Sequence, residues 1–151
     1  MEGICYFAFG MNMLEQNMKL QMPDAEFVGV ARLEGMRLVF RKTASVIPAA
    51  GFSVPVAVWR IGDEESDALR LMDVLECSPK RSTRTDATAR MDADGRLVGG
   101  VIYTPRLNPP RMPGKYYVRH MRECCAALGL DDAYIDEALA YTESEIAAGN
   151  N

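Results

Sequence analysis

A first candidate for proton transfer in this 151-residue chain is Glu76. It lies at the C-terminal end of an expected helix, where the helix dipole is negative and disfavours the charged form of a carboxyl group. A carboxyl group with a raised pKa could carry a proton to and from a reacting group near neutral pH. The alternative is a solvated surface carboxylate, and the spacing by itself favours that interpretation.

A second candidate is the stretch YFAFGMNM, residues 6–13. Its apolar residues indicate a buried strand that stops at Gly10, and a turn opened by glycine exposes backbone N–H groups that can bind an anion such as a carboxylate. Asn12 would add an amide donor. The alternative is an ordinary corner between a strand and a helix, with Asn12 capping the helix. On the residues alone both interpretations stay open.

Thiol chemistry is a third hypothesis, because Cys77 directly follows Glu76. The other cysteines are Cys5, Cys124 and Cys125, and none belongs to a C-x-x-C pair. No histidine lies nearby in the sequence to activate Cys77, and with one histidine in the chain a zinc site would need an unusual ligand set. We expect four reduced thiols that pack mostly as small hydrophobes.

Several other residues are expected to be structural. His120 lies in the middle of an expected helix, where it packs or faces solvent. Trp59 is expected to pack in the sheet. Lys80, Arg81 and Arg84 are expected to form a solvated strand face.

Composition excludes several classes of protein. The net charge of −4 argues against broad nucleic-acid binding. No apolar run approaches the roughly 20 residues of a membrane span, and the start of the chain lacks the basic region of a signal peptide. We therefore expect a cytoplasmic protein that binds neither membrane nor nucleic acid. The length fits one domain over 1–151, with its core at about 4–140 and a polar C-terminal tail.

The elements that must position these residues begin as strands. A continuous apolar run predicts a strand at 4–9, and a short helix is expected at 14–20. Runs at 26–33 and 36–42 predict a hairpin that turns at Glu34-Gly35. Two further strands are expected at 44–49 and 53–61, where Pro48 and Pro55 indicate strand ends or edges.

The apolar period then changes to that of a helix over 63–76, with Asp63 as its cap and Glu64 and Glu65 in its first turn. A hairpin follows, formed by 81–92 and 96–104 around a DADG turn. Two helices close the chain, at 115–128 before Gly129 and from Asp131 or Asp132 to about 147. This order predicts an α+β fold with a mostly antiparallel, barrel-like sheet.

Five stretches in order resemble the γ-glutamylcyclotransferase family, which includes γ-glutamylamine cyclotransferases and a butirosin-pathway cyclotransferase. Tyr6–Met13 resembles its Y-F-A-Y-G-S-N-[LM] strand. The others are PDAEFVGVARLEGMRLVF (23–40), VPVAVWRI (54–61), LRLMDVLEC (69–77), which is similar to L-x-x-L-D-x-x-E-G, and PGKYYVRHMRECCAALGLDDAYIDEAL (113–139). The resemblance spans about residues 4–140.

The resemblance implies a small, mixed, mostly antiparallel β-barrel with flanking helices. It implies that Glu76 is the general acid and base of a reaction that releases 5-oxoproline and a free amine from a small-molecule γ-glutamyl substrate, without a cofactor. The released amine and a homodimer are left open. The substrate-binding residues that it implies are Tyr6, Phe7, Ala8, Phe9, Gly10, Met11, Asn12 and Tyr117.

The chain also departs from the family pattern. Phe9 replaces a tyrosine, Met11 a serine and Cys77 the glycine after the glutamate, while Cys124 and Cys125 replace a glycine-alanine pair. These departures favour either an altered substrate or the alternative hypothesis, a relative that binds a small amino-acid-like ligand or a protein partner without turnover.

Overall fold

The computed structural model describes residues 3–63, 66–106 and 108–149. Its sheet is a closed barrel with the strand order β1-β3-β2-β4-β5. Strands β1 and β5 are parallel where they close the barrel, and the other neighbouring strands are antiparallel. The predicted mixed, mostly antiparallel barrel is confirmed. The strands are β1 (Ile4–Ala8), β2 (Glu26–Arg41), β3 (Thr43–Gly62), β4 (Ser82–Met91) and β5 (Leu97–Pro105).

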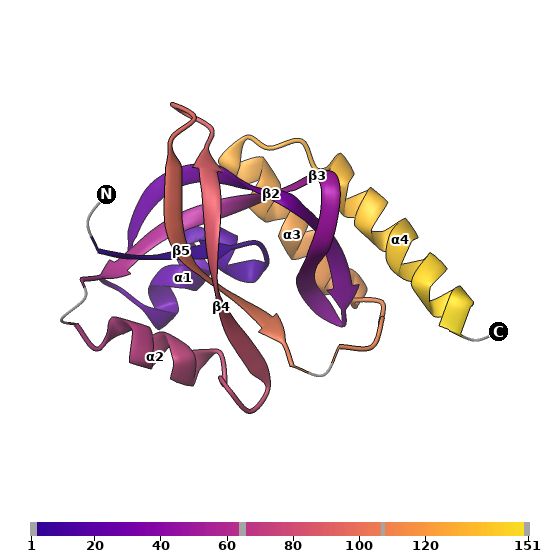
Figure 1. Ribbon diagram of the computed structural model, residues 1–151, viewed down its shortest axis with the longest axis horizontal. Coiled ribbons are helices and arrows are strands. Elements are labelled where there is room, and N and C mark those ends of the chain that lie inside the picture. The colour runs from indigo at the N-terminus through magenta and orange to yellow at the C-terminus, as the bar shows by residue number, and fades with distance from the viewer. Residues whose placement is uncertain (1–2, 64–65, 107, 150–151) are drawn as a thin grey trace.

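Helices flank the barrel, also as predicted. Figure 1 shows α3 and α4 behind and beside the long arm formed by β2 and β3, with α2 at the lower edge of the barrel. Helix α3 ends at Gly129, whose φ of 69° is left-handed and favours glycine. The helices are α1 (Glu15–Gln21), α2 (Ala68–Leu75), α3 (Lys115–Leu128) and α4 (Ala133–Gly149), and a short 3-10 helix, η1, spans Met11–Met13. Within the described residues, no helix has the length and apolarity needed to cross a membrane.

The prediction of a turn at Glu34-Gly35 is wrong, because β2 continues through it. The pairing with β3 jumps from Glu34↔Ser53 to Met36↔Pro48, so Gly35 lies in a bulge, where its φ is 78°. The hairpin turns instead at Lys42, a single residue between the paired Arg41 and Thr43. A glycine signal therefore marked a bend within a strand rather than its end.

The two runs predicted at 44–49 and 53–61 belong to one strand, β3, and both prolines lie inside it. The pairing of β3 with β1 stops at Ala57. Pro48 and Pro55 lie beyond that point, where the pairs of β3 are with β2. Proline has no backbone N–H group to donate. It is tolerated at these positions because one side of β3 has no neighbouring strand that would accept a hydrogen bond.

Helix α2 begins later than predicted. It starts at Ala68 with Asp67 at the cap position, whereas Asp63 was expected to cap it. The Ser66 hydroxyl donates a hydrogen bond to the Asp63 carbonyl oxygen (2.8 Å), and such local side-chain bonds favour a turn over a helix. Glu64 and Glu65 lie outside the described residues. The end of the helix agrees with the prediction, and Glu76 is its C-terminal cap residue.

Strand β1 is buried on both faces, which fixes the place where it ends. Phe7 packs in one apolar cluster with Phe40, and Tyr6 and Ala8 pack in a second cluster with Trp59. Burying a large apolar side chain stabilises the fold by about 1.5–3 kcal/mol. The residues that follow β1 are therefore held at a defined position in the molecule.

Candidate active site

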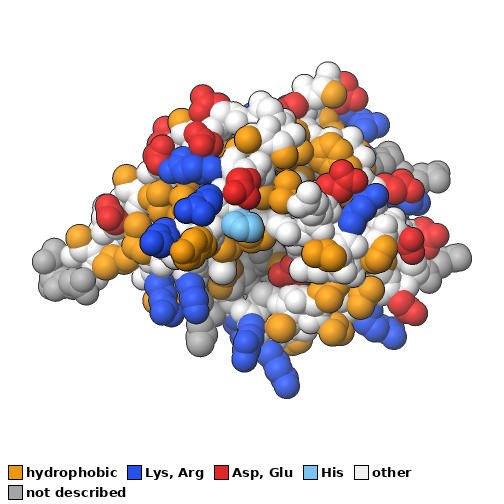
Figure 2. Space-filling view, turned by 180° about the vertical axis from the view of Figure 1, so that it is seen from behind, with side chains coloured by type: hydrophobic (Ala, Val, Ile, Leu, Met, Phe, Trp, Pro, Cys, Tyr) orange, Lys and Arg blue, Asp and Glu red, His pale blue; other side chains and the backbone are white. Residues whose placement is uncertain are grey.

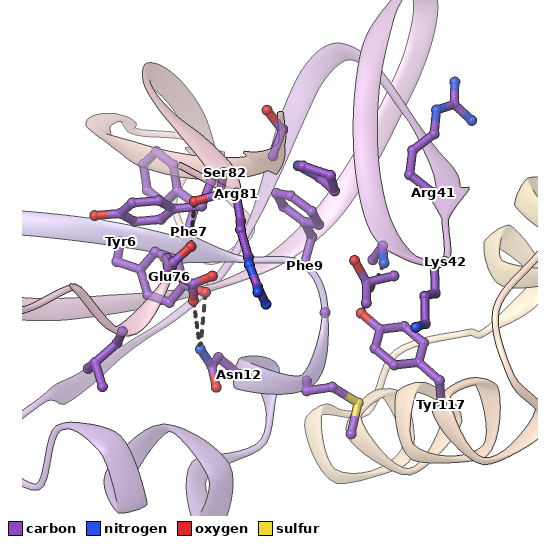
Figure 3. A pocket seen from close by; sticks show the side chains of 18 of the residues that line it. Tyr6, Phe7, Phe9, Asn12, Arg41, Lys42, Glu76, Arg81, Ser82 and Tyr117 are labelled. Carbon is purple, nitrogen blue, oxygen red and sulfur yellow. Dashed lines mark hydrogen bonds between the residues drawn. The ribbon is translucent and has the colours of Figure 1, made fainter. Parts of the chain in front are cut away.

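A cavity of about 600 Å³ lies at the end of β1 (Figure 3). Its walls come from segments far apart in the sequence: β1 and η1, the β2–β3 turn, the end of α2, strands β4 and β5, and α3. The lining residues are Tyr6, Phe7, Phe9, Gly10, Met11, Asn12, Gln21, Arg41, Lys42, Thr43, Ala44, Leu75, Glu76, Arg81, Ser82, Tyr103, Thr104, Pro105 and Tyr117.

The structure brings most of the predicted site residues to this cavity. Glu76, Tyr117 and the stretch Phe9–Asn12 line it, together with Tyr6 and Phe7. Ala8 is the exception. Its side chain is buried among the apolar residues around Trp59 and does not line the cavity. Tyr6 lies on the same face of β1 as Ala8 and in the same cluster, but its longer side chain reaches the cavity and the methyl group of Ala8 does not.

Glu76 lies partly buried in the wall of the cavity. Its Oε1 accepts a hydrogen bond from Asn12 Nδ2 at 3.4 Å, and the same amide donates to the Tyr6 hydroxyl at 3.3 Å (Figure 3). Burial raises the pKa of Glu76 above its ordinary value. Burial and the nearby Glu76 charge also raise the pKa of Tyr6, which keeps it a neutral phenol. A carboxyl with a raised pKa is suited to exchange protons near neutrality.

Asn12 points toward Glu76 because a side chain of the sheet holds the Asn12 backbone in place. The Trp59 indole N–H donates to the Asn12 carbonyl oxygen at 2.9 Å. Gly10 and Leu14 occupy the cap positions of η1 and α1, and neither helix has a side-chain cap bond. The hypothesis that Asn12 caps a helix is therefore wrong. Its amide is instead one of the polar groups of the cavity.

The end of α2 is fixed by contacts with two strands. The Ser82 hydroxyl donates to the Glu76 carbonyl oxygen at 2.6 Å. One oxygen of Asp73 accepts from the Tyr103 hydroxyl and the other from Arg84, both at 2.7 Å. Arg84 is exposed on β4, as expected for a solvated strand face, and it forms this ion pair there. Together these bonds determine where the Glu76 carboxyl lies.

Glycine at position 10 allows the backbone to lie close to the Tyr117 hydroxyl group. A Cβ atom added to Gly10 would lie 2.8 Å from the Tyr117 hydroxyl oxygen. That hydroxyl accepts the N–H of Ala44 at 3.0 Å, so its own proton stays free to donate into the cavity. Burial raises the pKa of Tyr117 to about 12, so the phenol keeps its proton at neutral pH.

We expect Gly10→Ala to destabilise the protein by about 1–3 kcal/mol, because the new methyl group overlaps the Tyr117 hydroxyl. Tyr117→Phe removes the clashing atom, so the double variant should regain much of the loss in a thermal unfolding cycle. Gly114→Ala is a matched control, because an added Cβ meets nothing within 4 Å there. Additive losses in the two single variants would contradict this explanation.

Several residues that line the cavity were not predicted from the sequence. Arg81 was assigned to a solvated strand face, and its side chain is exposed, yet it lines the cavity with Glu76. The backbone turns sharply after α2, with bonds from Ser78 N to Asp73 O and from Arg81 N to Cys77 O, both 2.8 Å. A signal existed in the short distance between Arg81 and Glu76 along the chain. Lys42 and Tyr103 had no comparable signal, since only the fold brings them here.

All four cysteines are free thiols and three of them are buried, in agreement with the expectation that they pack mostly as small hydrophobes. Cys5, Cys124 and Cys125 are buried, and Cys77 is exposed. Cys124 lies beneath the cavity wall, with its thiol 3.9 Å from the Met11 carbonyl oxygen. Cys77 does not line the cavity. Its φ of 55° is unusual for a residue with a side chain.

We expect Cys77→Gly to keep activity and to raise the unfolding temperature slightly. A left-handed backbone costs a residue with a Cβ about 1–2 kcal/mol, and glycine removes that cost while losing some chain entropy. Cys77→Ser keeps the Cβ and should behave like wild type in thermal melts and in turnover. A folded but inactive Cys77→Ser protein would instead favour the thiol hypothesis.

His120 does not line the cavity. His120 is exposed on α3 (Figure 2), as expected for a residue outside the site. On the face shown in Figure 2, acidic, basic and apolar side chains are interspersed.

Among the described residues, no group of three or more histidine, cysteine, aspartate or glutamate side chains is arranged to hold a metal ion.

Comparisons with known proteins agree with this architecture. The family model described as gamma-glutamyl cyclotransferase, AIG2-like, matches residues 6–141. A structure of an uncharacterised human protein is similar at 22% identity and a TM-score of 0.75, over 97% of this chain and 88% of that chain. A structure named gamma-glutamyl cyclotransferase has 22% identity and a TM-score of 0.69 over the same shares. A mouse AIG2-like protein has 21% identity and a TM-score of 0.57, over 78% of this chain and 84% of that chain. No curated protein matches the chain. These similarities in structure show a shared fold.

Proposed function

The chain belongs to the gamma-glutamyl cyclotransferase, AIG2-like family, and from this premise we propose that it cyclises a γ-glutamyl amine or amide and releases 5-oxoproline and a free amine. The observation that carries the proposal is the position of Glu76. Its carboxyl, with a pKa raised by burial, shares a cavity with Asn12 and the residues that end β1.

The reaction needs one group that first accepts and then donates a proton. The α-ammonium of the γ-glutamyl group loses a proton to the Glu76 carboxylate. The free amine attacks the γ-carbonyl carbon and forms the new C–N bond of a five-membered lactam. The bond from that carbon to the leaving nitrogen then breaks, and the leaving nitrogen takes the proton from Glu76. The attacking nitrogen loses a second proton when it becomes the neutral lactam N–H, and the released amine takes up this proton and leaves as an ammonium. Atoms and charge then balance, and no water is consumed. A carboxyl near both nitrogens serves both steps.

Donors around the cavity can hold the two negative charges of this reaction, the α-carboxylate and the developing oxyanion. The first N–H groups of a helix such as η1 have no acceptor within the helix, so the N–H groups of Gly10–Asn12 suit the α-carboxylate. The Tyr117 hydroxyl, whose oxygen already accepts from Ala44, can donate to the oxyanion. Met11 offers no hydroxyl, so the backbone carries the binding that a serine would share.

Binding without turnover is the second candidate, and Phe9 and Met11 favour it because both remove a hydroxyl that the family pattern places at the site. Phe9 is nearly buried, with 6% of its surface exposed, and it packs in the core cluster as well as lining the cavity. Its ring therefore contributes more to packing than to polar recognition. Thiol catalysis has less support, since Cys77 does not line the cavity.

The proposal is tested by incubating the purified protein with a panel of γ-glutamyl amino acids and γ-glutamyl amines and measuring 5-oxoproline by mass spectrometry. Release from at least one compound, above a heat-denatured control, supports the enzyme. Binding of a panel compound without 5-oxoproline release would support the second candidate. Absence of both would contradict the assignment of this cavity to γ-glutamyl compounds.

A further inference from the structure

The charges around the cavity exceed what a γ-glutamyl group needs. Three cationic side chains line it, those of Arg41, Lys42 and Arg81, against one carboxylate, Glu76. Arg41 is engaged elsewhere. Its guanidinium pairs with Glu145 at 2.9 Å and points away from Glu76 in Figure 3. Within the described residues, the side-chain charges of Lys42 and Arg81 have no hydrogen-bond or ion-pair partner. Two cations are therefore available to a ligand.

These two cations lie on different walls. Figure 3 shows Arg81 on the side of Glu76 and Asn12, and Lys42 on the opposite side next to Tyr117. The α-amine must lie at Glu76 to lose its proton, and the α-carboxylate is bonded to the same carbon atom as that amine. The α-carboxylate therefore falls on the wall of Arg81 and Asn12. The Lys42 ammonium lies on the far wall, where the leaving amine would extend.

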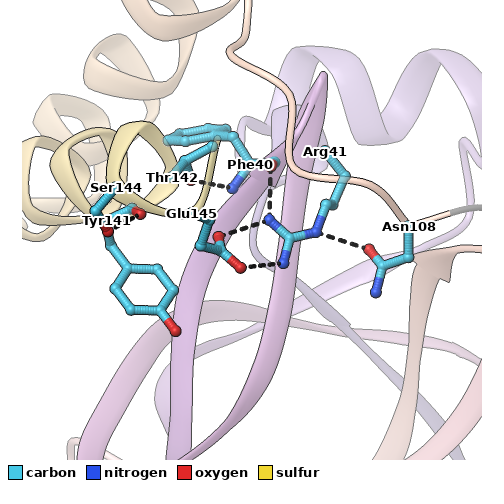
Figure 4. A network of polar contacts seen from close by, with 7 residues as sticks. All are labelled: Phe40, Arg41, Asn108, Tyr141, Thr142, Ser144 and Glu145. Atoms are coloured by element: carbon cyan, nitrogen blue, oxygen red, sulfur yellow. Dashed lines mark hydrogen bonds and ion pairs between the residues drawn. The ribbon is translucent and has the colours of Figure 1, made fainter. Parts of the chain in front are cut away.

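The backbone that carries Lys42 is held rigidly. Lys42 has a φ of 73°, and its N–H donates to the Arg111 carbonyl oxygen at 2.9 Å. The neighbouring Ala44 N–H bonds to Tyr117, and Arg41 bonds to Glu145 and Asn108 (Figure 4). Contacts with the 108–111 segment, α3 and α4 therefore fix the turn.

The backbone of Lys42 has a left-handed conformation that is unfavourable for a residue with a side chain. Lys42 and Cys77 are the residues other than glycine with positive φ in the described chain, and of the two only Lys42 lines the cavity. Strain of this kind persists where the surroundings hold it in place, and it concentrates at functional sites. At the β2–β3 turn, the strained residue is a lysine that lines the cavity.

Resting on the proposed function, we infer that Lys42 is a specificity-determining residue that binds an anionic group on the leaving amine. The substrate class is then a γ-glutamyl compound whose leaving amine carries a carboxylate or a comparable anion. Amines without an anion, including cationic polyamines, would be poorer substrates because they leave Lys42 unpaired or face it with a like charge.

The test uses two compounds that differ in one charge, γ-glutamylglycine and γ-glutamylglycinamide. Wild type should show a kcat/KM about five- to tenfold higher for γ-glutamylglycine. An effect of this size lies between the usual contribution of an exposed ion pair and that of a hydrogen bond to a charged group. Lys42→Gln should bring the ratio of the two values close to one, and Lys42→Glu should bring it below one. Lys80→Gln removes an exposed charge that does not line the cavity, and it should keep the wild-type ratio.

Equal kcat/KM values for the two compounds in wild type would overturn the inference, as would a loss in Lys42→Gln that is the same for both. If wild type turns over neither compound, the proposed function is wrong for them and calorimetry decides the inference. Tighter binding of γ-glutamylglycine that disappears in Lys42→Gln would still support the role of Lys42. Equal or absent binding of the two compounds would overturn it.

Discussion

Glu76→Gln is expected to reduce kcat for 5-oxoproline release by about 10²–10⁴-fold, the usual cost of losing a positioned general base. Glutamine keeps the shape of the side chain and can still contact Asn12, so substrate binding should change little. It cannot accept a proton from the α-ammonium or deliver one to the leaving nitrogen. Glu143→Gln, at an exposed position on α4, is the matched control and should leave turnover unchanged.

Thermal melts separate this loss of chemistry from a loss of folding. Because burial raises the pKa of Glu76, the folded state binds its proton more tightly than the unfolded state does. The stability from this group is therefore present at low pH and is lost as pH rises through the folded-state pKa. Glu76→Gln is neutral at every pH and should melt at or above the wild-type temperature at pH 8. A folded variant with unchanged turnover would remove Glu76 from the mechanism.

Arg41→Gln is expected to produce the largest loss of stability, about 3 kcal/mol. The Arg41 side chain is 5% exposed, and its two terminal nitrogens each lie 2.9 Å from a Glu145 oxygen (Figure 4). Removing one partner leaves the carboxylate of Glu145 partly buried and unpaired. In a chain of this size the unfolding temperature should fall by roughly 6–12 °C, measured by calorimetry or circular dichroism.

Arg32→Gln is the control for that loss. Arg32 pairs with Asp92 at 3.4 Å, with both side chains about 40% exposed (41% and 39%), and exposed pairs contribute at most about 1 kcal/mol. A double variant, Arg41→Met with Glu145→Leu, should regain stability because no charge is left unpaired. An Arg41→Gln protein that melts like Arg32→Gln would contradict a stabilising role for this ion pair.

Much of the fold follows from local sequence signals. The apolar run that ends at Gly10 gave β1, and Gly129 marked the end of α3, where its left-handed backbone allows the helix to stop. Local signals of the same kind gave a wrong prediction where pairing with a distant strand determines whether a strand ends or continues. The neighbours of Gly35 predict a turn, yet the 16-residue strand β2 runs through it with a bulge.

The cavity was predicted in part, and the reason lies in how its walls are assembled. Glu76 and residues 9–12 carry recognisable patterns and line one cavity. Ala8 belongs to the same motif, but its short side chain is buried in the cluster around Trp59 and does not reach the cavity. Lys42 reaches the cavity because β2 and β3 form one long hairpin that docks on α3 and α4, a tertiary arrangement that no local pattern encodes.

A crystal structure of the Glu76→Gln protein with γ-glutamylglycine tests the central claim most directly, because this variant should bind the intact substrate without cleaving it. We expect the ligand in the 600 Å³ cavity, with its α-amine within hydrogen-bonding distance of the residue 76 side chain. Its α-carboxylate should lie at Gly10–Asn12 and its glycine carboxylate toward Lys42. A ligand bound outside this cavity, or inside it with the α-amine out of reach of residue 76, would contradict the role of Glu76 as the base.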